Sequence, residues 1–217
     1  MITIACVYWK SRKGPEYIPN GWIDALQRMI DRNVTVPYRF VCLSNTRVPC
    51  ERIPLENNWD VWWSKVELFR PGLFEGRVFY LDLDTIIVGN IDELLEREEK
   101  FIALKPFNPH KGLLRNYFAS GLMSWEADGT YDFIYEKFAE DPVEYRRQFR
   151  GDQDYMSHIV SREGKSFARW QYLVPGIYSY KRHIHNGAIK TENAKVICFH
   201  GNPRPWKVKV YEDIIGK

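Results

Sequence analysis

The chain has 217 residues, of which 45% are hydrophobic and 27% are charged. This balance is ordinary for a globular protein and excludes a disordered chain. The formal net charge is +3, from 31 Lys and Arg against 28 Asp and Glu, which is too small to indicate nucleic-acid binding by itself. Aromatic residues are abundant at 15%, and their flat faces pack in cores and also stack on sugars and bases.

Apolar runs separated by amphipathic stretches predict strands that alternate with helices. The predicted strands are 2–8, 38–43, 78–81, 85–88, 101–104, 122–125 and 195–199. The predicted helices are 22–30, 60–69, 91–96, 131–139 and one that begins near 152. In the second of these helices, Trp62, Val66 and Phe69 are expected to share one face. The alternation predicts an α/β sandwich with a mostly parallel sheet, and because no linker or repeat divides the chain, we expect one domain over 1–217.

The cysteines and the hydropathy pattern bear on location. The four cysteines lack C-x-x-C or zinc-type spacing, and Cys6, Cys42 and Cys198 lie within apolar runs, as free buried thiols do. No uncharged stretch approaches the ~18 residues needed to cross a bilayer. The apolar run at 2–9 also lacks the basic start of a signal peptide. We therefore expect a cytoplasmic protein, with any membrane association peripheral.

An acidic pair follows the strand predicted at 78–81. Asp82 and Asp84 are separated by one residue, so in extended backbone their side chains point to the same side. Ligands bind at the carboxyl ends of strands in open α/β sheets, and two carboxylates there could hold Mg²⁺ or Mn²⁺ and, through the ion, a diphosphate. The spacing alone is a weak signal, because 152–154 repeats it, and two solvated acids in a loop are the alternative. The apolar neighbours favour a bound cation, since buried acids are costly when unpaired.

Five segments, in order, resemble those of nucleotide-sugar glycosyltransferases with the GT-A fold. The acidic pair resembles the D-x-D motif of these enzymes, most closely in family 8, which includes glycogenins and bacterial lipopolysaccharide galactosyltransferases. The other segments resemble that family's lysine-bearing helix, F-N-A/S-G-V-M strand, D-Q-D helix start and C-terminal G-x-x-K-P-W, and are 63–65, 117–123, 152–155 and 201–206. The resemblance spans nearly the whole chain. It implies a GT-A-like, Rossmann-like α/β/α sandwich whose mixed central sheet is mostly parallel.

The resemblance implies a role for each matching residue. Asp82 and Asp84 would bind Mn²⁺ or Mg²⁺ and, through it, the donor diphosphate. Asp152 and Gln153 would lie at the reaction centre as the catalytic candidates. The residues that would contact the nucleotide sugar are Ala5, Val7, Tyr8, Lys65, Asp82, Leu83, Ser120, Gly201 and Arg204. Arg204 stands where the family has a lysine, and a guanidinium can bind a phosphate through two parallel hydrogen bonds.

Two positions depart from the family pattern. A metal-binding histidine usually stands three residues before the glycine, and here that position is Cys198, whereas His200 directly precedes Gly201. Because alternate strand residues share a face and a hard ion favours imidazole over a thiol, His200 is the predicted third metal ligand and Cys198 the alternative. Ala119 stands where the family often has an asparagine directed at the donor sugar, which leaves the identity of the donor open.

These residues together predict metal-dependent transfer of a sugar from a nucleotide-diphosphate donor, UDP-linked, to a hydroxyl acceptor. Retention at the anomeric carbon is implied by the family alone. The acceptor would be a glycan, a lipid-linked glycan or another molecule with a hydroxyl group. The basic groups at 146–150 and 181–185 would also suit a polyanionic acceptor, such as an anionic lipid-linked glycan or a modified DNA base.

Other interpretations of the same residues remain open. A metal-dependent nucleotidyltransferase would also use paired aspartates, but the stretch 10–14 is a poor version of the Gly-rich phosphate loop it would need. A non-catalytic sugar-binding module would suit the aromatic content, but it does not require the acidic pair, His200 and Arg204 together. Lys65 could equally be a surface residue of an amphipathic helix. Asp152 could be a helix N-cap, and His200 could be an ordinary hydrogen-bonded histidine. Trp62 and Trp63 are expected in the core.

Overall fold

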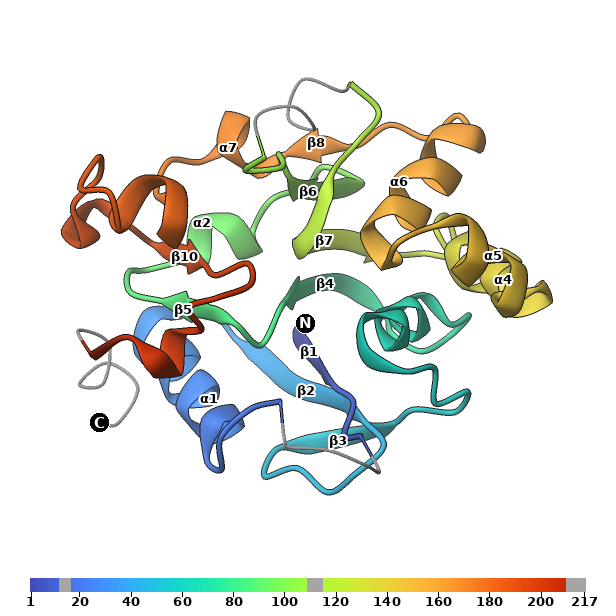
Figure 1. Cartoon of the computed structure of the whole chain (residues 1–217), viewed down its shortest axis with the longest axis horizontal. Helices are drawn as coiled ribbons and strands as arrows, with labels where there is room; N and C mark the ends of the chain where they lie inside the picture. Colours follow the sequence, from blue (N-terminus) through green and yellow to red (C-terminus); the bar gives the residue numbers. More distant parts are fainter. Residues whose placement is uncertain (12–16, 109–114, 210–217) are drawn as a thin grey trace.

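The computed structural model of the chain describes residues 1–11, 17–108 and 115–209. Within this part, seven strands form a central sheet (Figure 1). In spatial order they are β3 (Glu51–Pro54), β2 (Tyr38–Ser44), β1 (Ile2–Tyr8), β4 (Gly76–Leu81), β7 (Ala119–Ala127), β6 (Phe101–Leu104) and β8 (Ala168–Arg169). β7 runs antiparallel to β4 and β6, and the other pairs are parallel. The mixed, mostly parallel sheet that the sequence predicts is thus confirmed.

A second, three-stranded sheet connects the turn after β4 to the C-terminal segment. Its strands are β5 (Thr85–Ile87), β10 (Val196–Cys198) and β9 (Ile177–Ser179). β10 is antiparallel to β5, with Cys198 opposite Thr85. The pairing continues past the strand end, because Phe199 N–H donates to the carbonyl of Asp84 at 3.0 Å. This sheet therefore carries the residues after β10 to the acidic turn.

Helices cover both faces of the central sheet, which gives three layers (Figure 1). One face carries the second sheet together with α1 (Trp22–Asn33), α2 (Asp92–Leu95) and α7 (Trp170–Leu173). The other carries the 3₁₀ helix η1 (Val61–Phe69), α4 (Phe133–Glu140), α5 (Pro142–Gln148) and α6 (Asp152–Arg162). Short turns of helix near the C-terminus are η2 (Tyr180–Ile184), η3 (Thr191–Asn193) and η4 (Pro205–Lys207).

The alternation of side chains along β1 explains the layering. Ile4 and Cys6 lie in the hydrophobic cluster beneath α1, whereas Ala5 and Val7 lie in the cluster beneath η1, α4 and α6. A strand that is buried on both faces has a continuous apolar sequence, and the segment 2–8 has such a sequence.

The elements that sequence analysis did not predict are short or peripheral. β3, β8 and β9 have four, two and three residues, too few for a periodic pattern to emerge. α5 does have a start signal, because Pro142 is its first residue and Asp141 accepts a hydrogen bond of 3.0 Å from Glu144 N–H. The stretch 10–14, the poor version of a phosphate loop, lies partly outside the described residues.

In residues 1–11, 17–108 and 115–209, the structure has no helix with the length and apolar character needed to cross a membrane. The apolar side chains instead fill the two clusters on either side of the sheet. The largest aromatic residues contribute to both, with Trp22 and Trp170 in one cluster and Trp63 and Trp125 in the other. Much of the high aromatic content therefore serves the core.

Candidate active site

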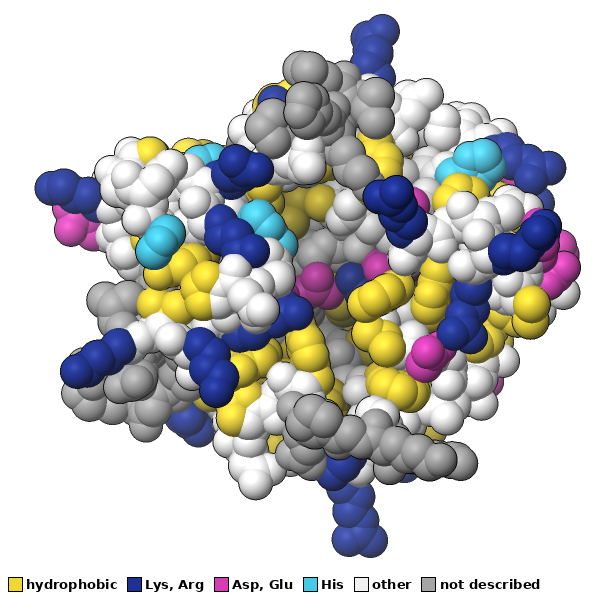
Figure 2. Space-filling model, in the orientation of Figure 1, with side chains coloured by type: hydrophobic (Ala, Val, Ile, Leu, Met, Phe, Trp, Pro, Cys, Tyr) yellow, Lys and Arg dark blue, Asp and Glu magenta, His cyan; other side chains and the backbone are white. Residues whose placement is uncertain are grey.

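A pocket of about 450 Å³ lies at the carboxyl ends of β1 and β4, where open α/β sheets bind ligands. Its volume lies within the range of small-molecule sites. Its walls come from β1, η1, the turn after β4, the first residue of α6 and the segment after β10. Figure 2 shows this hollow in the middle of one face, with acidic and basic side chains at its floor and further Lys and Arg side chains around it.

The predicted acidic pair lies on a turn rather than on a strand. β4 ends just before Asp82, and the turn is closed by a hydrogen bond of 3.1 Å from Thr85 N–H to the carbonyl of Asp82. Leu83, between the two acids, is buried, and its carbonyl accepts a hydrogen bond of 2.6 Å from the Trp22 indole. Asp82 and Asp84 both line the pocket. The turn therefore directs both carboxylates to one side, an arrangement that the sequence predicts for a strand.

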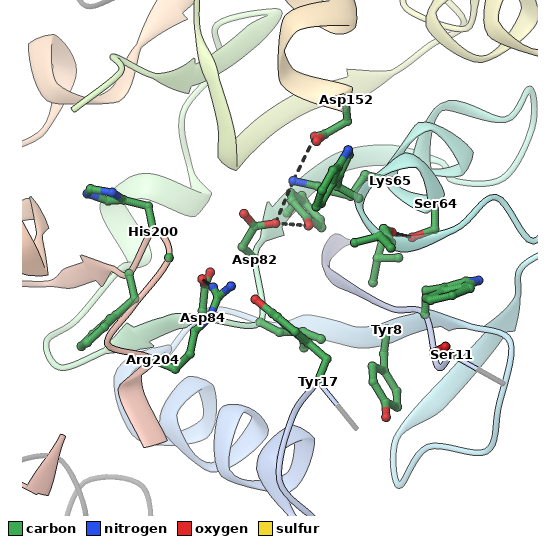
Figure 3. A pocket seen from close by; sticks show the side chains of 18 residues that line it. Tyr8, Ser11, Tyr17, Ser64, Lys65, Asp82, Asp84, Asp152, His200 and Arg204 are labelled. Atoms are coloured by element: carbon green, nitrogen blue, oxygen red, sulfur yellow. Dashed lines mark hydrogen bonds and ion pairs between the residues drawn. The ribbon is translucent and has the colours of Figure 1, made fainter. Parts of the chain in front are cut away.

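Lys65, from η1, links the acidic turn to the start of α6 (Figure 3). Its ammonium lies 3.0 Å from Asp82 Oδ1 and 2.9 Å from Asp152 Oδ2. Ser120, from β7, supports this contact, because its hydroxyl donates to Asp152 Oδ2 at 2.6 Å and accepts from Lys65 Nζ at 3.2 Å. The Tyr80 hydroxyl donates to Asp82 Oδ1 at 2.5 Å. One cation thus joins the central sheet, η1 and α6.

This network excludes two of the alternative interpretations. Lys65 is only 8% exposed, so it is not a surface lysine. The N-cap of α6 is Gly151, and Asp152 directs its carboxylate to Lys65 and Ser120 instead of capping the helix. Burial alone would lower the pKa of Lys65, but Asp152 and Asp82 raise it above its ordinary value. Lys65 is therefore protonated at neutral pH.

Asp84 pairs with Arg204, which lies in the segment after β10 (Figure 3). The centre of the guanidinium also lies 4.8 Å from the centroid of the Tyr17 ring. Burial, together with the nearby Asp82 carboxylate, raises the pKa of Asp84 to about 7, although Arg204 and Lys65 oppose the change. The site therefore contains a carboxylate that is costly to ionise, which is a frequent property of functional sites.

The two aspartates of the turn fit a hard divalent cation. Mg²⁺ commonly takes one or two carboxylates and completes its coordination with water and substrate phosphates, and Mn²⁺ suits the same oxygen ligands. A further positive charge would favour the ionised form of the buried Asp84 beside Asp82. In the described ranges, no three or more His, Cys, Asp and Glu side chains are grouped so that they could hold a metal ion. The arrangement thus offers two protein ligands rather than the expected three.

His200 lines the pocket but does not join the acidic pair. Its imidazole points away from the two aspartates (Figure 3), forms a 2.6 Å hydrogen bond with the Ser179 hydroxyl and stacks on Phe107 with 5.6 Å between ring centroids. The prediction assumed a continuous strand, whereas β10 ends at Cys198, so the rule that alternate residues share a face no longer applies at His200. The interpretation of His200 as an ordinary hydrogen-bonded histidine therefore matches the structure.

Cys198, the alternative third ligand, is buried beside the acidic turn, opposite Thr85. Burial raises the pKa of its thiol, and the nearby Asp84 and Asp82 carboxylates raise it further. A protonated thiol is a poor ligand for a hard ion. Neither Cys198 nor His200 therefore joins Asp82 and Asp84 as a third metal ligand in this structure.

Most of the predicted donor-binding and catalytic residues line the pocket. They are Val7, Tyr8, Lys65, Asp82, Leu83, Asp152, Gly201 and Arg204. Ala5 is instead fully buried within β1, and Ser120 lies behind the pocket wall as a partner of Lys65. The Gln153 amide is held outside the lining, because its Nε2 donates to the Tyr117 hydroxyl at 2.7 Å.

Sequence analysis missed two tyrosines of the site. Tyr80, which donates to Asp82, precedes it by two residues, so the alternation along the strand would have placed the two side chains together. Tyr17 stacks over Arg204 from a stretch without periodic pattern, and no signal in the sequence points to it.

The prediction that both tryptophans of η1 lie in the core is half right. Trp63 is 5% exposed, whereas Trp62 is 48% exposed and lines the pocket. The predicted α-helical period placed Trp62 on one face with Val66 and Phe69. A 3₁₀ helix has three residues per turn, so Trp63, Val66 and Phe69 share the buried face instead.

Comparisons of the sequence with models of protein families and with curated proteins find no match. Comparison of the structure does find solved relatives of the fold. The galactosyltransferase LgtC in complex with donor and acceptor sugar analogues aligns with a TM-score of 0.62 at 12% identity, over 99% of this chain and 95% of that one. An active-site mutant of LgtC gives a TM-score of 0.66 at 11% identity, over 98% and 93%.

Longer glycosyltransferases match as well. GlyE of Streptococcus pneumoniae TIGR4 aligns with a TM-score of 0.61 at 15% identity, over 94% of this chain and 56% of that chain. The bifunctional glycosyltransferase WbbM aligns with 0.61 at 17% identity, over 99% and 49%. The chain thus spans about half the length of these two proteins. Identities this low indicate a shared fold, and the chain has the GT-A-type α/β/α fold of these glycosyltransferases.

Replacement of the bridging lysine tests the network. Lys65→Met leaves the buried Asp152 carboxylate without its cation, so we expect the free energy of unfolding to fall by about 3 kcal/mol. Urea denaturation measures this change. The control is Lys100→Met, whose ion pair with Asp128 is exposed and should contribute less than about 1 kcal/mol. Equal effects of the two substitutions would contradict the network.

The pKa of Asp84 predicts how stability depends on pH in the metal-free protein. The carboxyl holds its proton to pH about 7 when folded but releases it near pH 4 when unfolded, so its contribution to stability falls as pH rises from 4 to 7. Asp84→Asn removes this penalty. In EDTA at pH 8 we expect the variant to be more stable than the wild type, with the difference shrinking toward pH 5. Thermal unfolding across this range measures it, and a constant destabilisation would overturn it.

Proposed function

We propose that the protein transfers a sugar from a nucleotide-diphosphate donor, UDP-linked, to a hydroxyl acceptor, with Mn²⁺ or Mg²⁺ as cofactor. One observation carries the proposal: the D-x-D turn, Lys65, Asp152 and Arg204 line a single pocket at the carboxyl end of the sheet. The fold shared with solved glycosyltransferases supports the same class of reaction. A sugar-binding module would not require this collection of charges at one point.

The charge balance of the pocket supports the need for a metal ion. Three carboxylates, Asp82, Asp84 and Asp152, face only two cations, Lys65 and Arg204, among the described lining residues. The floor therefore has no surplus positive charge with which to bind an anionic diphosphate. A divalent ion on the D-x-D turn would supply that charge and stabilise the departing nucleoside diphosphate.

Arg204 is suited to bind the donor phosphates. Its side chain is one quarter exposed and lines the pocket, and Asp84 and Tyr17 hold the guanidinium in place. Planar guanidinium groups bind phosphate oxygens through two parallel hydrogen bonds. The guanidinium is already oriented to donate hydrogen bonds to the charge that develops on the leaving diphosphate. It would therefore lower the activation barrier without any reorganisation of the side chain.

Asp152 is suited to the reaction centre. Its carboxylate is fixed by Lys65 and Ser120, and it lies next to the acidic turn where the diphosphate would leave. Glycosyl transfer passes through a state with oxocarbenium character, which a nearby carboxylate oxygen stabilises. Gln153 would have to release Tyr117 before its amide could take this role. Retention at the anomeric carbon is part of the proposal through the family resemblance.

Release of nucleoside diphosphate tests the proposal. The protein is incubated with a panel of nucleotide sugars and Mn²⁺, with and without EDTA. We expect hydrolysis of one donor, loss of this activity with EDTA or in Asp84→Ala, and a fall in kcat/KM of about 100-fold in Arg204→Met. The control is Arg39→Met, because Arg39 forms an ion pair with Glu51 away from the pocket.

Each rival function gives a different result in the same assay. A nucleotidyltransferase would release pyrophosphate from a nucleoside triphosphate. A sugar-binding module would bind free glycans without turnover. If turnover of a nucleotide sugar persists both in EDTA and in Asp84→Ala, glycosyl transfer is still supported but the role of the acidic pair is refuted.

A further inference from the structure

The wall of the pocket beside Asp152 is apolar and open to solvent. Trp62 and Val61, at the start of η1, are 48% and 45% exposed, and both line the pocket. In contrast, the charged groups at the floor, Lys65 and Asp152, have side chains that are 10% and 7% exposed. Trp62 and Val61 are adjacent and share one wall of the pocket, and tryptophan is enriched among the residues that contribute most to binding energy.

The position of Trp62 depends on Gly151, the residue before Asp152. A side chain at Gly151 would place its Cβ 3.0 Å from Trp62 Nε1 and 3.2 Å from Trp62 Cδ1, which is too close for an ordinary contact. One edge of the indole therefore packs on the backbone at the start of α6. Trp62 and Asp152 are held next to each other at the same side of the pocket.

The chain before Trp62 is held by a buried acid. Glu67 is fully buried, and its carboxylate accepts hydrogen bonds from the backbone N–H groups of Glu56, Asn57 and Asn58 at 2.7, 3.1 and 3.1 Å. This support holds the segment 56–58 against η1, close to the point where the chain enters the pocket wall.

The backbone at the entry to η1 adopts an unfavourable conformation. Val61 has φ 55°, a left-handed value that is a genuine outlier for a β-branched residue. The Ser64 hydroxyl donates to the carbonyl of Val61 at 2.6 Å and fixes this conformation. Backbone strain of this kind persists where the surrounding structure enforces it, and it concentrates at functional sites. Here the strained residue and Trp62 together form the open wall.

We propose that Trp62 is the platform on which the pyranose ring of the acceptor stacks. The inference rests on the proposed function and adds the acceptor subsite to it. A pyranose has one face made of C–H groups, which packs on an indole, and hydroxyl groups around its edge. Asp152, directly beside Trp62, would accept a hydrogen bond from such a hydroxyl and so fix the orientation of the acceptor.

The depth of the groups in the pocket assigns Trp62 to the acceptor rather than to the donor. The groups suited to the diphosphate and the reaction centre are at the floor, so the donor would lie deeper in the pocket than Trp62. An acceptor approaches from solvent and meets the exposed wall formed by Trp62 and Val61. If Trp62 instead stacked on the nucleotide base, its removal would weaken donor binding in the absence of any acceptor.

The test separates acceptor binding from donor use. Trp62→Ala, Trp62→Phe and the control Tyr172→Ala are compared with the wild type; Tyr172 is an exposed aromatic residue outside the pocket. Transfer to a panel of p-nitrophenyl glycosides gives the acceptor KM, and nucleotide release without acceptor gives the donor KM. We expect Trp62→Ala to raise the acceptor KM about tenfold and to leave the donor KM within about twofold. Trp62→Phe should restore most of the affinity, and Tyr172→Ala should behave as the wild type.

A donor-free readout distinguishes failure of this inference from failure of the proposed function. Saturation-transfer NMR with methyl glycosides should show binding to the wild type and Trp62→Phe and loss of binding in Trp62→Ala. If the wild type turns over no nucleotide sugar, glycosyl transfer is refuted, while loss of the NMR signal in Trp62→Ala still supports the platform. The platform is refuted if glycosides do not bind the wild type, if Trp62→Ala binds them equally well, or if its donor KM rises as much as its acceptor KM.

Discussion

The ammonium group of Lys65 holds the candidate site together. It contacts Asp82 after β4 and Asp152 at the start of α6, and Ser120 of β7 supports it from behind. Three segments that are distant in sequence must therefore be in place before both carboxylates are paired with Lys65. Buried charges tolerate little displacement, because an unpaired ion in a low-dielectric interior is strongly destabilising. The same contacts that stabilise the fold thus determine the geometry of the pocket.

The second sheet performs the corresponding role on the other side of the pocket. β10 pairs with β5 and brings Arg204 to Asp84, and the Tyr17 ring lies over the guanidinium. The two aspartates of the turn are consequently held by two different cations from two different parts of the chain. Lys65 and Arg204 oppose the rise in the pKa of Asp84, but burial and the nearby Asp82 still leave Asp84 difficult to ionise. A divalent ion on the turn would favour the ionised form of Asp84 and would offset the negative charge of a bound diphosphate.

Much of this arrangement can be predicted from the sequence, and the failures have physical causes. The apolar runs predict the central strands because buried parallel strands require them, and the acidic pair was placed correctly although a turn, not a strand, orients it. His200 was misplaced because the end of β10 cannot be read from a single sequence. Trp62 was misplaced because the period of a 3₁₀ helix differs from that of an α-helix. The burial of Lys65 depends on partners far along the chain, which no local pattern reveals.

The proposed function depends on the pocket binding a nucleoside diphosphate through a metal ion on the two aspartates. Isothermal titration calorimetry with UDP tests this directly, in buffer with Mn²⁺ and in buffer with EDTA. We expect binding in Mn²⁺ and an affinity at least about tenfold lower in EDTA, because the floor alone has more acidic than basic groups. Absence of binding heat in Mn²⁺, or equal affinity in both buffers, would contradict it.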